Sequence, residues 1–584
     1  MKDPIRIANC SGFFGDRLSA AKEMVEGGRI DVLTGDWLAE LTMLILARTQ
    51  AKRPGGGYAR TFVMQLEQVM GTCLDKGIKV VSNAGGLDPE GCAKAVAEVA
   101  EKLGLHPKIA FVRGDDLMPR MAELVASDQL HHFETGEPIK EASFLTANAY
   151  FGCWGIVDAL NRGADIVITG RTTDAAVVCG PAAWHHGWSR TDWDALAGGV
   201  TAGHVIECGT QATGGNYSFF TEVPGLVRTG FPWAEVAADG STVIGKHEGT
   251  GGEVSIGTIT SQLLYEIGGR EYFGPDVTTR FDTIELEQVG PDRVRMHGIQ
   301  GEPPPATLKV CLNRTGGFRN DMTVCLTGLE IEAKAKLVEE AFWEACPYGP
   351  EDYAQVTTRL IRTDKSDPET NEQAVALWRI SAKDPDEKKV GRAFANAVTE
   401  LGLATIPGFF GIGGGPAGGR PFGVYEPARI AAELVPQEVT MLASDSTQVS
   451  SVVPRPDVRV EPTPGPDAVT PGGETRRAPL GAVFGARSGD KGGNANLGVF
   501  ARSDEAWAWL DAFLTEERLR ELLPEVAPLP IDRHRLASLR SINFVVHGLL
   551  EEGVAASTRQ DAQAKSLGEW LRARVVDLPV VLLP

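Results

Sequence analysis

Paired cysteines and long apolar runs are missing from this sequence. Its nine cysteines stand singly along 584 residues, and no two form a C-x-x-C pair. This pattern argues against a zinc finger and a disulfide framework, and it predicts reduced thiols. No apolar run approaches the ~20 residues that span a bilayer, and residues 1–7 lead into a strand pattern without an apolar signal segment. We therefore expect a soluble, cytoplasmic protein with no membrane partner.

Basic residues are in the minority. The 57 Lys and Arg face 77 Asp and Glu, which gives a formal net charge of −20. A nucleic-acid backbone selects basic surfaces, so the balance argues against nucleic acid as a partner. It does not exclude a small anionic ligand, which needs only a local pocket. We expect a small-molecule substrate and a homo-oligomeric assembly.

Several signatures of catalysis and cofactor binding are also missing. The sequence has neither a G-x-S-x-G elbow nor an H-E-x-x-H helix. Residues 413–418, GGGPAG, match G-x-G-x-x-G, but Pro416 and Pro421 would break the helix that a dinucleotide fingerprint requires. His204 and Glu207 have no third metal ligand at a defined spacing. The sequence thus predicts no redox cofactor and no metal.

Short apolar runs alternate with amphipathic helix patterns in the first half of the chain. The runs fit strands of a parallel sheet that helices cover on both faces, and they lie at residues 5–9, 30–34, 79–82, 109–112 and 166–169. The sequence therefore predicts an α/β fold with a mostly parallel sheet.

The chain divides into four expected segments. Residues 1–305 form the α/β core lobe and residues 306–451 a second α/β lobe, with strands at 307–312 and 322–327. Residues 452–477 hold six prolines and are expected to be a linker.

The last segment, residues 478–584, is expected to be a two-layer α+β module of ferredoxin-like type. Two expected strands, at 480–484 and 496–501, flank a glycine-rich loop. A longer strand is expected at 535–546. Its expected helices lie at 504–523 and 560–575.

Polar, glycine-rich turns follow the predicted parallel strands. Ligands in open α/β sheets gather at the carboxyl ends of strands, so these turns are expected to meet around one crevice. Arg171 carries particular weight, because a cation at a helix N-terminus opposes the helix dipole unless an anion lies there. The alternative is that Thr172 and Asp174 only cap the helix. The expected substrate-binding residues in these turns are Gly12, Asp16, Asp36, Asn83, Gly85, Gly170, Arg171, Thr172 and Asp174.

Two further stretches gather acid–base side chains. Residues 204–209, HVIECG, precede 211–217, QATGGNY, and general acid–base chemistry requires such groups in a partly dry pocket. Residues 245–253, GKHEGTGGE, precede a helix pattern and favour an anion site or, equally, a charged loop. We expect catalytic roles for His204, Glu207 and His247, and substrate contacts for Asn216 and Lys246.

Residues 485–496, GARSGDKGGNAN, form the sharpest local signal. Successive backbone amides in a glycine-rich turn can bind an anion. The run is not a Walker loop, because Gly492 follows Lys491 where a Ser or Thr is required. The alternative is a long hairpin whose glycines satisfy backbone constraints. The expected anion-binding residues are Arg487, Ser488, Gly489, Lys491, Gly492 and Asn494.

Taken in order, these motifs resemble the AtuA family, named for acyclic terpene utilisation. The resemblance rests on residues 7–16, IANCSGFFGD, on 31–40, DVLTGDWLAE, and on 168–174, ITGRTTD. Residues 487–494, RSGDKGGN, resemble the AtuA-like ferredoxin-fold module. Members of the family are associated with bacterial breakdown of citronellol- and geraniol-type compounds through branched acyl-CoA thioesters.

The resemblance implies an enzyme that acts on an acyl-CoA-type substrate, with hydratase or lyase chemistry and no redox cofactor. Coenzyme A would enter only as part of the substrate, and Asn83 could help to polarise the thioester carbonyl. One alternative is a non-catalytic acyl-CoA-binding or scaffold subunit of a catabolic complex. A second is a nucleotide-dependent kinase or ligase.

Overall fold

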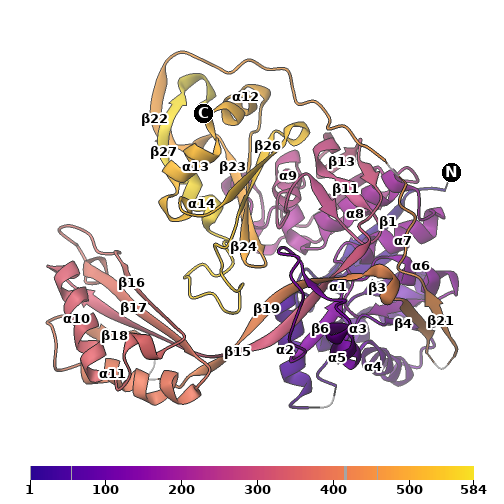
Figure 1. The fold of residues 1–584 in the computed structure, drawn as a ribbon. Coiled ribbons are helices and arrows are strands. Elements are labelled where there is room, and N and C mark those ends of the chain that lie inside the picture. The colour runs from indigo at the N-terminus through magenta and orange to yellow at the C-terminus, as the bar shows by residue number, and fades with distance from the viewer. Residues whose placement is uncertain (1, 54, 413–416, 443, 457) are drawn as a thin grey trace. The chain divides into compact units, whose positions relative to one another are not determined.

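The computed structural model describes residues 2–53, 55–412, 417–442, 444–456 and 458–584. It divides into two compact units (Figure 1). Unit 1 contains Met1–Asn313, Tyr425–Val554 and Gln563–Pro584, and unit 2 contains Arg314–Val424 and Ala555–Ala562. Most of the G-x-G-x-x-G match, residues 413–416, lies outside the described residues.

An 11-stranded mixed sheet forms the centre of unit 1. Its five middle strands are parallel, and their order is β1 (Ile5–Asn9), β2 (Val32–Gly35), β3 (Lys79–Ser82), β7 (Ile166–Thr169) and β4 (Ile109–Arg113). Antiparallel strands extend both edges: β8 (Pro232–Val236), β9 (Thr242–Lys246), β13 (Arg293–His297) and β12 (Glu285–Gly290) beyond β1, and β20 (Gln437–Met441) and β21 (Ser446–Val449) beyond β4. The α/β class is confirmed, and the parallel arrangement is confined to the middle of the sheet.

Helices cover both faces of this sheet because its middle strands carry apolar side chains on both faces. Ile7 and Val81 belong to one buried cluster, whereas Ala8 and Val80 belong to another. The first cluster includes residues of α6 (Trp154–Asn161), α7 (Ala176–His186), α8 (Trp193–Ile206) and α9 (Ile256–Leu263). The second includes residues of α1 (Ala20–Gly27), α2 (Glu40–Gln50), α3 (Arg60–Lys76) and α4 (Pro89–Lys102).

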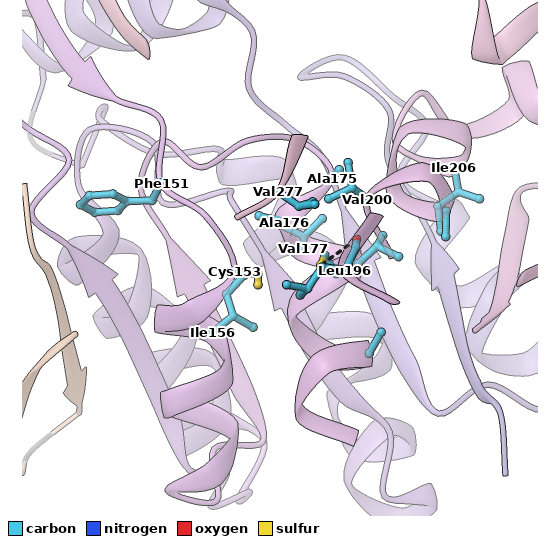
Figure 2. Close-up of a cluster of buried hydrophobic side chains, with 14 of the residues drawn as sticks. Phe151, Cys153, Ile156, Ala175, Ala176, Val177, Leu196, Val200, Ile206 and Val277 are labelled. Carbon is cyan, nitrogen blue, oxygen red and sulfur yellow. Dashed lines mark hydrogen bonds between the residues drawn. The ribbon is translucent and has the colours of Figure 1, made fainter. Parts of the chain in front are cut away.

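The packing of α7 against α8 positions the residues that follow β7. Figure 2 shows Ala176 and Val177 of α7 beside Leu196 and Val200 of α8. A Cβ atom on Gly203 would lie only 2.6 Å from Ala175 Cα, so the two segments approach as closely as a glycine allows. The end of α8 is therefore held against the loop that links β7 to α7.

Smaller elements complete unit 1. Strands β10 (Glu271–Phe273), β11 (Thr278–Arg280) and β14 (Gln300–Glu302) form a separate three-stranded sheet. Along the chain, the short helix α5 (Met121–Ala126) follows β4 and precedes the strands β5 (His131–His132) and β6 (Thr146–Ala149). Within unit 1, β6 pairs with residues 310–313 of β15 (Thr307–Thr327), and β5 pairs with residues 428–429 of β19 (Arg420–Ala431).

The C-terminal module is a four-stranded antiparallel sheet packed against helices, as the expected two-layer α+β fold requires (Figure 1). The strand order is β23 (Gly485–Lys491), β24 (Asn494–Phe500), β26 (Ser541–Val546) and β25 (Ile531–Leu536). The helices are α12 (Asp504–Phe513), α13 (Glu516–Leu522) and α14 (Leu567–Arg572), and β22 (Thr475–Pro479) pairs with β27 (Val575–Pro579).

The module differs from the sequence prediction in several details. Residues 480–482 form a 3-10 turn where a strand was expected, and the expected helix at 560–575 is the shorter α14. The glycine-rich run is itself a strand, because β23 pairs with β24 through Lys491 and Asn494 and the chain turns at Gly492, whose φ is +64°. The expected strand at 535–546 is a hairpin, because Arg540 adopts a φ of +49° between β25 and β26. The expected helix at 504–523 is two helices, because the Thr515 side chain caps a new one.

The expected linker, residues 452–477, forms no helix or strand over its described residues 452–456 and 458–474, and its last three residues belong to β22. Unit 1 nevertheless holds it in place. Arg280 Nη1 donates to the Val460 carbonyl at 2.6 Å, and the Thr463 amide donates to the Asp282 carbonyl at 3.0 Å.

Unit 2 is a smaller antiparallel sheet with two helices. Residues 314–327 of β15 pair with β17 (Val375–Asp384) and β18 (Phe410–Gly411), and β16 (Gln355–Ile361) pairs with β17. Its core includes residues of α10 (Ile331–Ala345) and α11 (Phe394–Glu400). The separate strands expected at 307–312 and 322–327 are one continuous strand, β15. None of the helices in the described parts of either unit is long and apolar enough to cross a bilayer.

Candidate functional site

Polar residues converge at the carboxyl ends of the parallel strands. Asp36 follows β2 and is 5% exposed, and Asn83 follows β3 and is fully buried. Asn83 Nδ2 donates to Asp36 Oδ1 at 2.5 Å, and the Trp37 amide donates to Asn83 Oδ1 at 2.9 Å. The Asn83 side chain therefore holds the Asp36 carboxyl in a fixed orientation.

Three of the expected site glycines allow the turns to pack closely. A Cβ atom would lie within 2.6 Å of a neighbouring atom at each of them: Cys208 C at Gly12, the Thr169 carbonyl oxygen at Gly85 and Asp115 Oδ1 at Gly170. A side chain at any of the three would force the turns apart. Asp16 closes its own loop, because its Oδ2 accepts from the Gly12 amide at 3.0 Å.

Arg171 lies inside the protein, with 2% of its surface exposed. Its Nη1 donates to Asp174 Oδ1 at 2.6 Å, and its guanidinium lies 4.1 Å from the centre of the Tyr150 ring. Although burial opposes the charge, Asp174 and Tyr150 hold the pKa of Arg171 above its ordinary value. Among the described residues, Arg171 Nε and the buried Thr172 Oγ1 have no hydrogen-bond partner. Both atoms are thus buried polar groups that the described protein leaves without a hydrogen bond.

The end of α8 places His204 and Glu207 at the same site. His204 Nδ1 lies 3.2 Å from Glu207 Oε1, and the two side chains are 1% and 8% exposed. Burial and the charge of Lys491 lower the pKa of His204 to about 4, so its imidazole is neutral at pH 7. Burial and the nearby charges of Asp174 and Glu266 raise the pKa of Glu207 well above its ordinary value. Glu207 Oε2 accepts no hydrogen bond from any described residue.

We refer to Asp36, Asp174, Glu207 and Glu266 as the carboxylate cluster. Burial and the charges of Asp174 and Glu207 raise the pKa of Asp36 well above its ordinary value. Burial and the charges of Glu40 and Asp174 also raise the pKa of Glu266. Repulsion of this kind favours the protonated forms of Asp36 and Glu207.

Cations and aromatic rings border the carboxylate cluster. Lys309 lies 4.8 Å from the centre of the Tyr150 ring and donates to Glu40 Oε1 at 3.2 Å, and the Tyr150 hydroxyl donates to the same oxygen at 2.7 Å. Burial would raise the pKa of Glu40, but Lys309, Arg171 and the Tyr150 hydroxyl together hold it below its ordinary value. Lys491, from the C-terminal module, donates to the Glu266 carbonyl oxygen at 2.8 Å.

The structure places three expected site residues in other environments. Lys246 donates to the Thr250 carbonyl at 2.8 Å and forms an ion pair with Asp292 at 2.9 Å. The His247 ring packs against Gly27 and Gly28, and its Nε2 lies 3.0 Å from the Met24 carbonyl oxygen. Asn216 is exposed, and its Nδ2 donates to Gln211 Oε1 at 3.4 Å. None of these recorded contacts, all within the described residues, involves the carboxylate cluster.

The expected anion-binding residues mostly contact protein groups. Arg487 donates to Gln211 and lies over the Tyr265 ring, Ser488 Oγ accepts from the Gly568 amide, and Asn494 Nδ2 donates to Glu134 Oε1. Gly489 packs closely against Tyr265, and Gly492 forms the turn. Of this set, Lys491 acts by its charge on Glu207 and Glu266, and Arg487 also interacts electrostatically with Glu266. Anion binding at the hairpin stays a prediction.

Sequence reasoning missed Glu40, Tyr150, Glu266 and Lys309. Glu40 lies four residues beyond Asp36 and ends the run 31–40 that carries the family resemblance, so its position was a usable signal. Glu266 follows a helix and Lys309 lies within a strand, and neither position carries a motif. Across the residues that the structure describes, no three His, Cys, Asp or Glu side chains are arranged to hold a metal ion.

The fold and site define an α/β protein with a carboxylate-rich site at its parallel strand ends and an α+β module that contributes to that site. Comparison with protein families matches residues 5–441 to acyclic terpene utilisation family protein AtuA and residues 478–577 to the AtuA ferredoxin-like domain. The chain belongs to the AtuA family, which confirms the resemblance seen in its motifs. No curated protein matches the chain.

Proposed function

We propose that this protein is an enzyme of acyclic terpene or branched-chain acyl catabolism that acts on an acyl-CoA-type thioester by hydratase or lyase chemistry without a redox cofactor. Family membership supports the metabolic setting. The acid–base chemistry is supported by the buried Glu207 carboxyl beside neutral His204, with Oε2 unbonded to any described group.

An acid–base enzyme needs one group that gives a proton and another that takes it. Burial and neighbouring carboxylates raise the pKa values of Glu207 and Asp36 above the ordinary carboxyl range, so we assign these two groups as the proton donors. The neutral His204 imidazole can accept a proton. The site therefore has a donor and an acceptor 3.2 Å apart, in an environment that excludes most water.

Hydration or elimination beside a thioester places negative charge on the thioester oxygen. Arg171 and Lys491 are the cations that we assign to stabilise this charge, because both act electrostatically on Glu207. The Asn83 amide, a candidate for this role from the sequence, is used to hold Asp36. The assignment thus gives Asn83 a positioning role.

Solvent deuterium exchange tests this proposal because it detects proton transfer at carbon whatever the rest of the reaction is. The full-length protein is incubated in D2O with saturated and α,β-unsaturated branched acyl-CoA thioesters, and deuterium at the carbon beside the thioester is followed by mass spectrometry. We expect exchange by the unaltered protein and a loss of about 100-fold or more in E207Q and H204N.

Matched controls are E235Q and H186N. Glu235 is half-buried and paired with Arg6 and Arg293, and His186 is half-buried and bonded to the Val236 carbonyl. Both controls should retain exchange within about twofold. Binding of the thioesters without exchange by the unaltered protein would reject the catalytic proposal and favour an acyl-CoA-binding or scaffold subunit.

The position of Lys491 favours the enzyme over the scaffold, because it makes the C-terminal module part of the site. A nucleotide-dependent kinase or ligase would replace both if ATP, and not coenzyme A, stabilised the protein against heat. Homo-oligomeric assembly stays a prediction, and light scattering of the purified protein measures it.

A further inference from the structure

Residues 264–268, which follow α9, are bound by two buried asparagines of the C-terminal module. Asn496 Nδ2 donates to the Leu264 carbonyl at 2.7 Å, and its Oδ1 accepts from the Glu266 amide at 2.9 Å. Asn543 Nδ2 donates to the Gly268 carbonyl at 2.9 Å, and Asn543 Oδ1 accepts from Asn496 at 2.7 Å. The two side-chain amides thus act together on the backbone of one short segment.

Two glycines shape the module surface for this segment. A Cβ atom on Gly489 would lie 2.5 Å from Tyr265 Cε2, and one on Gly498 would lie 2.5 Å from Leu264 Cβ. A side chain at either position would displace residues 264–266. The glycines of β23 and β24 therefore serve the contact between the module and this segment.

Glu266 has a backbone conformation that residues with a Cβ atom rarely adopt. Its φ is +58°, in the left-handed region. Both of its backbone polar groups bond to the module, since the amide donates to Asn496 and the carbonyl accepts from Lys491 Nζ at 2.8 Å. Such strain persists where the surroundings over-determine it, and it concentrates at functional sites.

The Glu266 side chain belongs to the carboxylate cluster and differs from Glu207 in access. Its charge acts on Glu207, His204 and Tyr272. Glu207 is buried, whereas Glu266 is half-buried. Glu266 is thus the more exposed residue of the two.

We propose that Glu266 is a further acid–base residue of this site, and that Asn496 is the positioning residue by which the C-terminal module holds it there. The inference rests on the proposed function. In the exchange reaction the Glu266 carboxylate takes the proton from the carbon beside the thioester, the C–H electron pair moves into the enolate, and we assign Lys491 to stabilise the enolate charge. The acid exchanges its proton with solvent and returns a deuteron to carbon.

The test compares E266Q and N496A with S503A in the full-length protein. Ser503 caps α12 in the same module by accepting from the Ala506 amide, so S503A perturbs the module without touching residues 264–268. We expect the exchange rate constant to fall about 100-fold in E266Q with little change in KM, and about tenfold in N496A. S503A should stay within about twofold of the unaltered protein.

A second measurement needs no substrate. Carbodiimide labelling of carboxyl groups, resolved by peptide mass spectrometry over pH, reports the access and protonation of Glu266. N496A should shift the labelling profile of Glu266, whereas S503A should not. Thermal unfolding measures whether N496A is folded. If N496A is unfolded, the exchange rate of E266Q alone tests the role of Glu266.

Two results would overturn this inference and leave the proposed function intact. One is an E266Q enzyme that exchanges at the unaltered rate while E207Q is inactive, and the other is an unchanged Glu266 labelling profile in folded N496A. Failure of the proposed function has a different appearance, because the unaltered protein would then exchange no thioester at all. In that case the labelling profiles still decide whether Asn496 positions Glu266.

Discussion

His204 Nδ1 and Glu207 Oε1 lie 3.2 Å apart at the end of α8. The His204 ring is enclosed by aromatic rings, with centroids 5.1 Å from Tyr272 and 5.4 Å from Phe281. Neither ring nitrogen forms a well-aligned hydrogen bond with a described group. A neutral imidazole held in this way contributes little to stability through hydrogen bonding. Mutation can therefore remove its acid–base function while its packing is kept.

The first prediction concerns His204 itself. H204F keeps an aromatic ring of similar size among Tyr272 and Phe281, so its free energy of unfolding should stay within about 1 kcal/mol of the unaltered value. H204A leaves a cavity and should lose on the order of 2–4 kcal/mol. Both should lose deuterium exchange. Chemical denaturation measures stability, and an H204F protein with full exchange would contradict the assignment of His204 as an acid–base group.

The second prediction concerns the ion pair of buried Arg171 and half-buried Asp174. R171M should lower the free energy of unfolding by about 3 kcal/mol, because it leaves Asp36 and Asp174 close together without their cation. The double variant R171M/D174N should recover more than half of that loss. Denaturation of both single variants and the double variant gives the coupling energy. Additive losses would show that the pair does not act as a unit.

The parallel part of the fold could be predicted from the sequence because its strands are short apolar runs that end in polar turns. The same signal located Asp36, Asn83 and Arg171, because residues that directly follow parallel strands must lie at the same end of the sheet. His204 and Glu207 were recognised by their chemistry, although the sequence suggested a loop and the structure places them at the end of a helix.

The rest of the site depends on contacts between distant segments. Lys309 lies in β15 and Lys491 in the C-terminal module, and only tertiary packing brings both near Glu40 and Glu266. For His247, the structure shows packing contacts that the motif did not predict. A histidine in a glycine-rich turn resembles a catalytic group, yet its ring fills a space beside two glycines at the end of α1.

The third prediction concerns the close packing of α8 against the loop after β7. G203A should destabilise the protein by about 1–3 kcal/mol, because the added Cβ would lie 2.6 Å from Ala175 Cα. Gly71 lies within α3 and has only Leu105 Cδ1 near its Cβ position, at 3.8 Å. G71A should therefore stabilise the protein by about 0.5–1 kcal/mol through helix propensity. Thermal or chemical unfolding measures both, and changes of the same sign would contradict the packing argument.

The fourth prediction concerns Asp115, whose buried carboxyl accepts from the Arg171 amide at 2.9 Å and from Asn148 Nδ2 at 2.8 Å. Burial raises its pKa from 3.8 to about 7. A raised pKa in the folded state means that the stability contributed by the protonated carboxyl is fully present below about pH 4 and is lost progressively as the pH rises to about 7. D115N removes this ionisation and keeps an oxygen acceptor.

The unfolding free energy of D115N relative to the unaltered protein should therefore increase between pH 4 and pH 7, by up to about 4 kcal/mol. Denaturant titrations of both proteins at half-unit pH intervals measure the difference, and other titrating groups cancel because they are common to both. The matched control is D511N, since the half-buried Asp511 pairs with Arg533 at 2.7 Å and its arginine partners hold its pKa below the ordinary value. Its difference from the unaltered protein should lack the rise expected for D115N, and a D115N curve parallel to the unaltered one would contradict a raised pKa at Asp115.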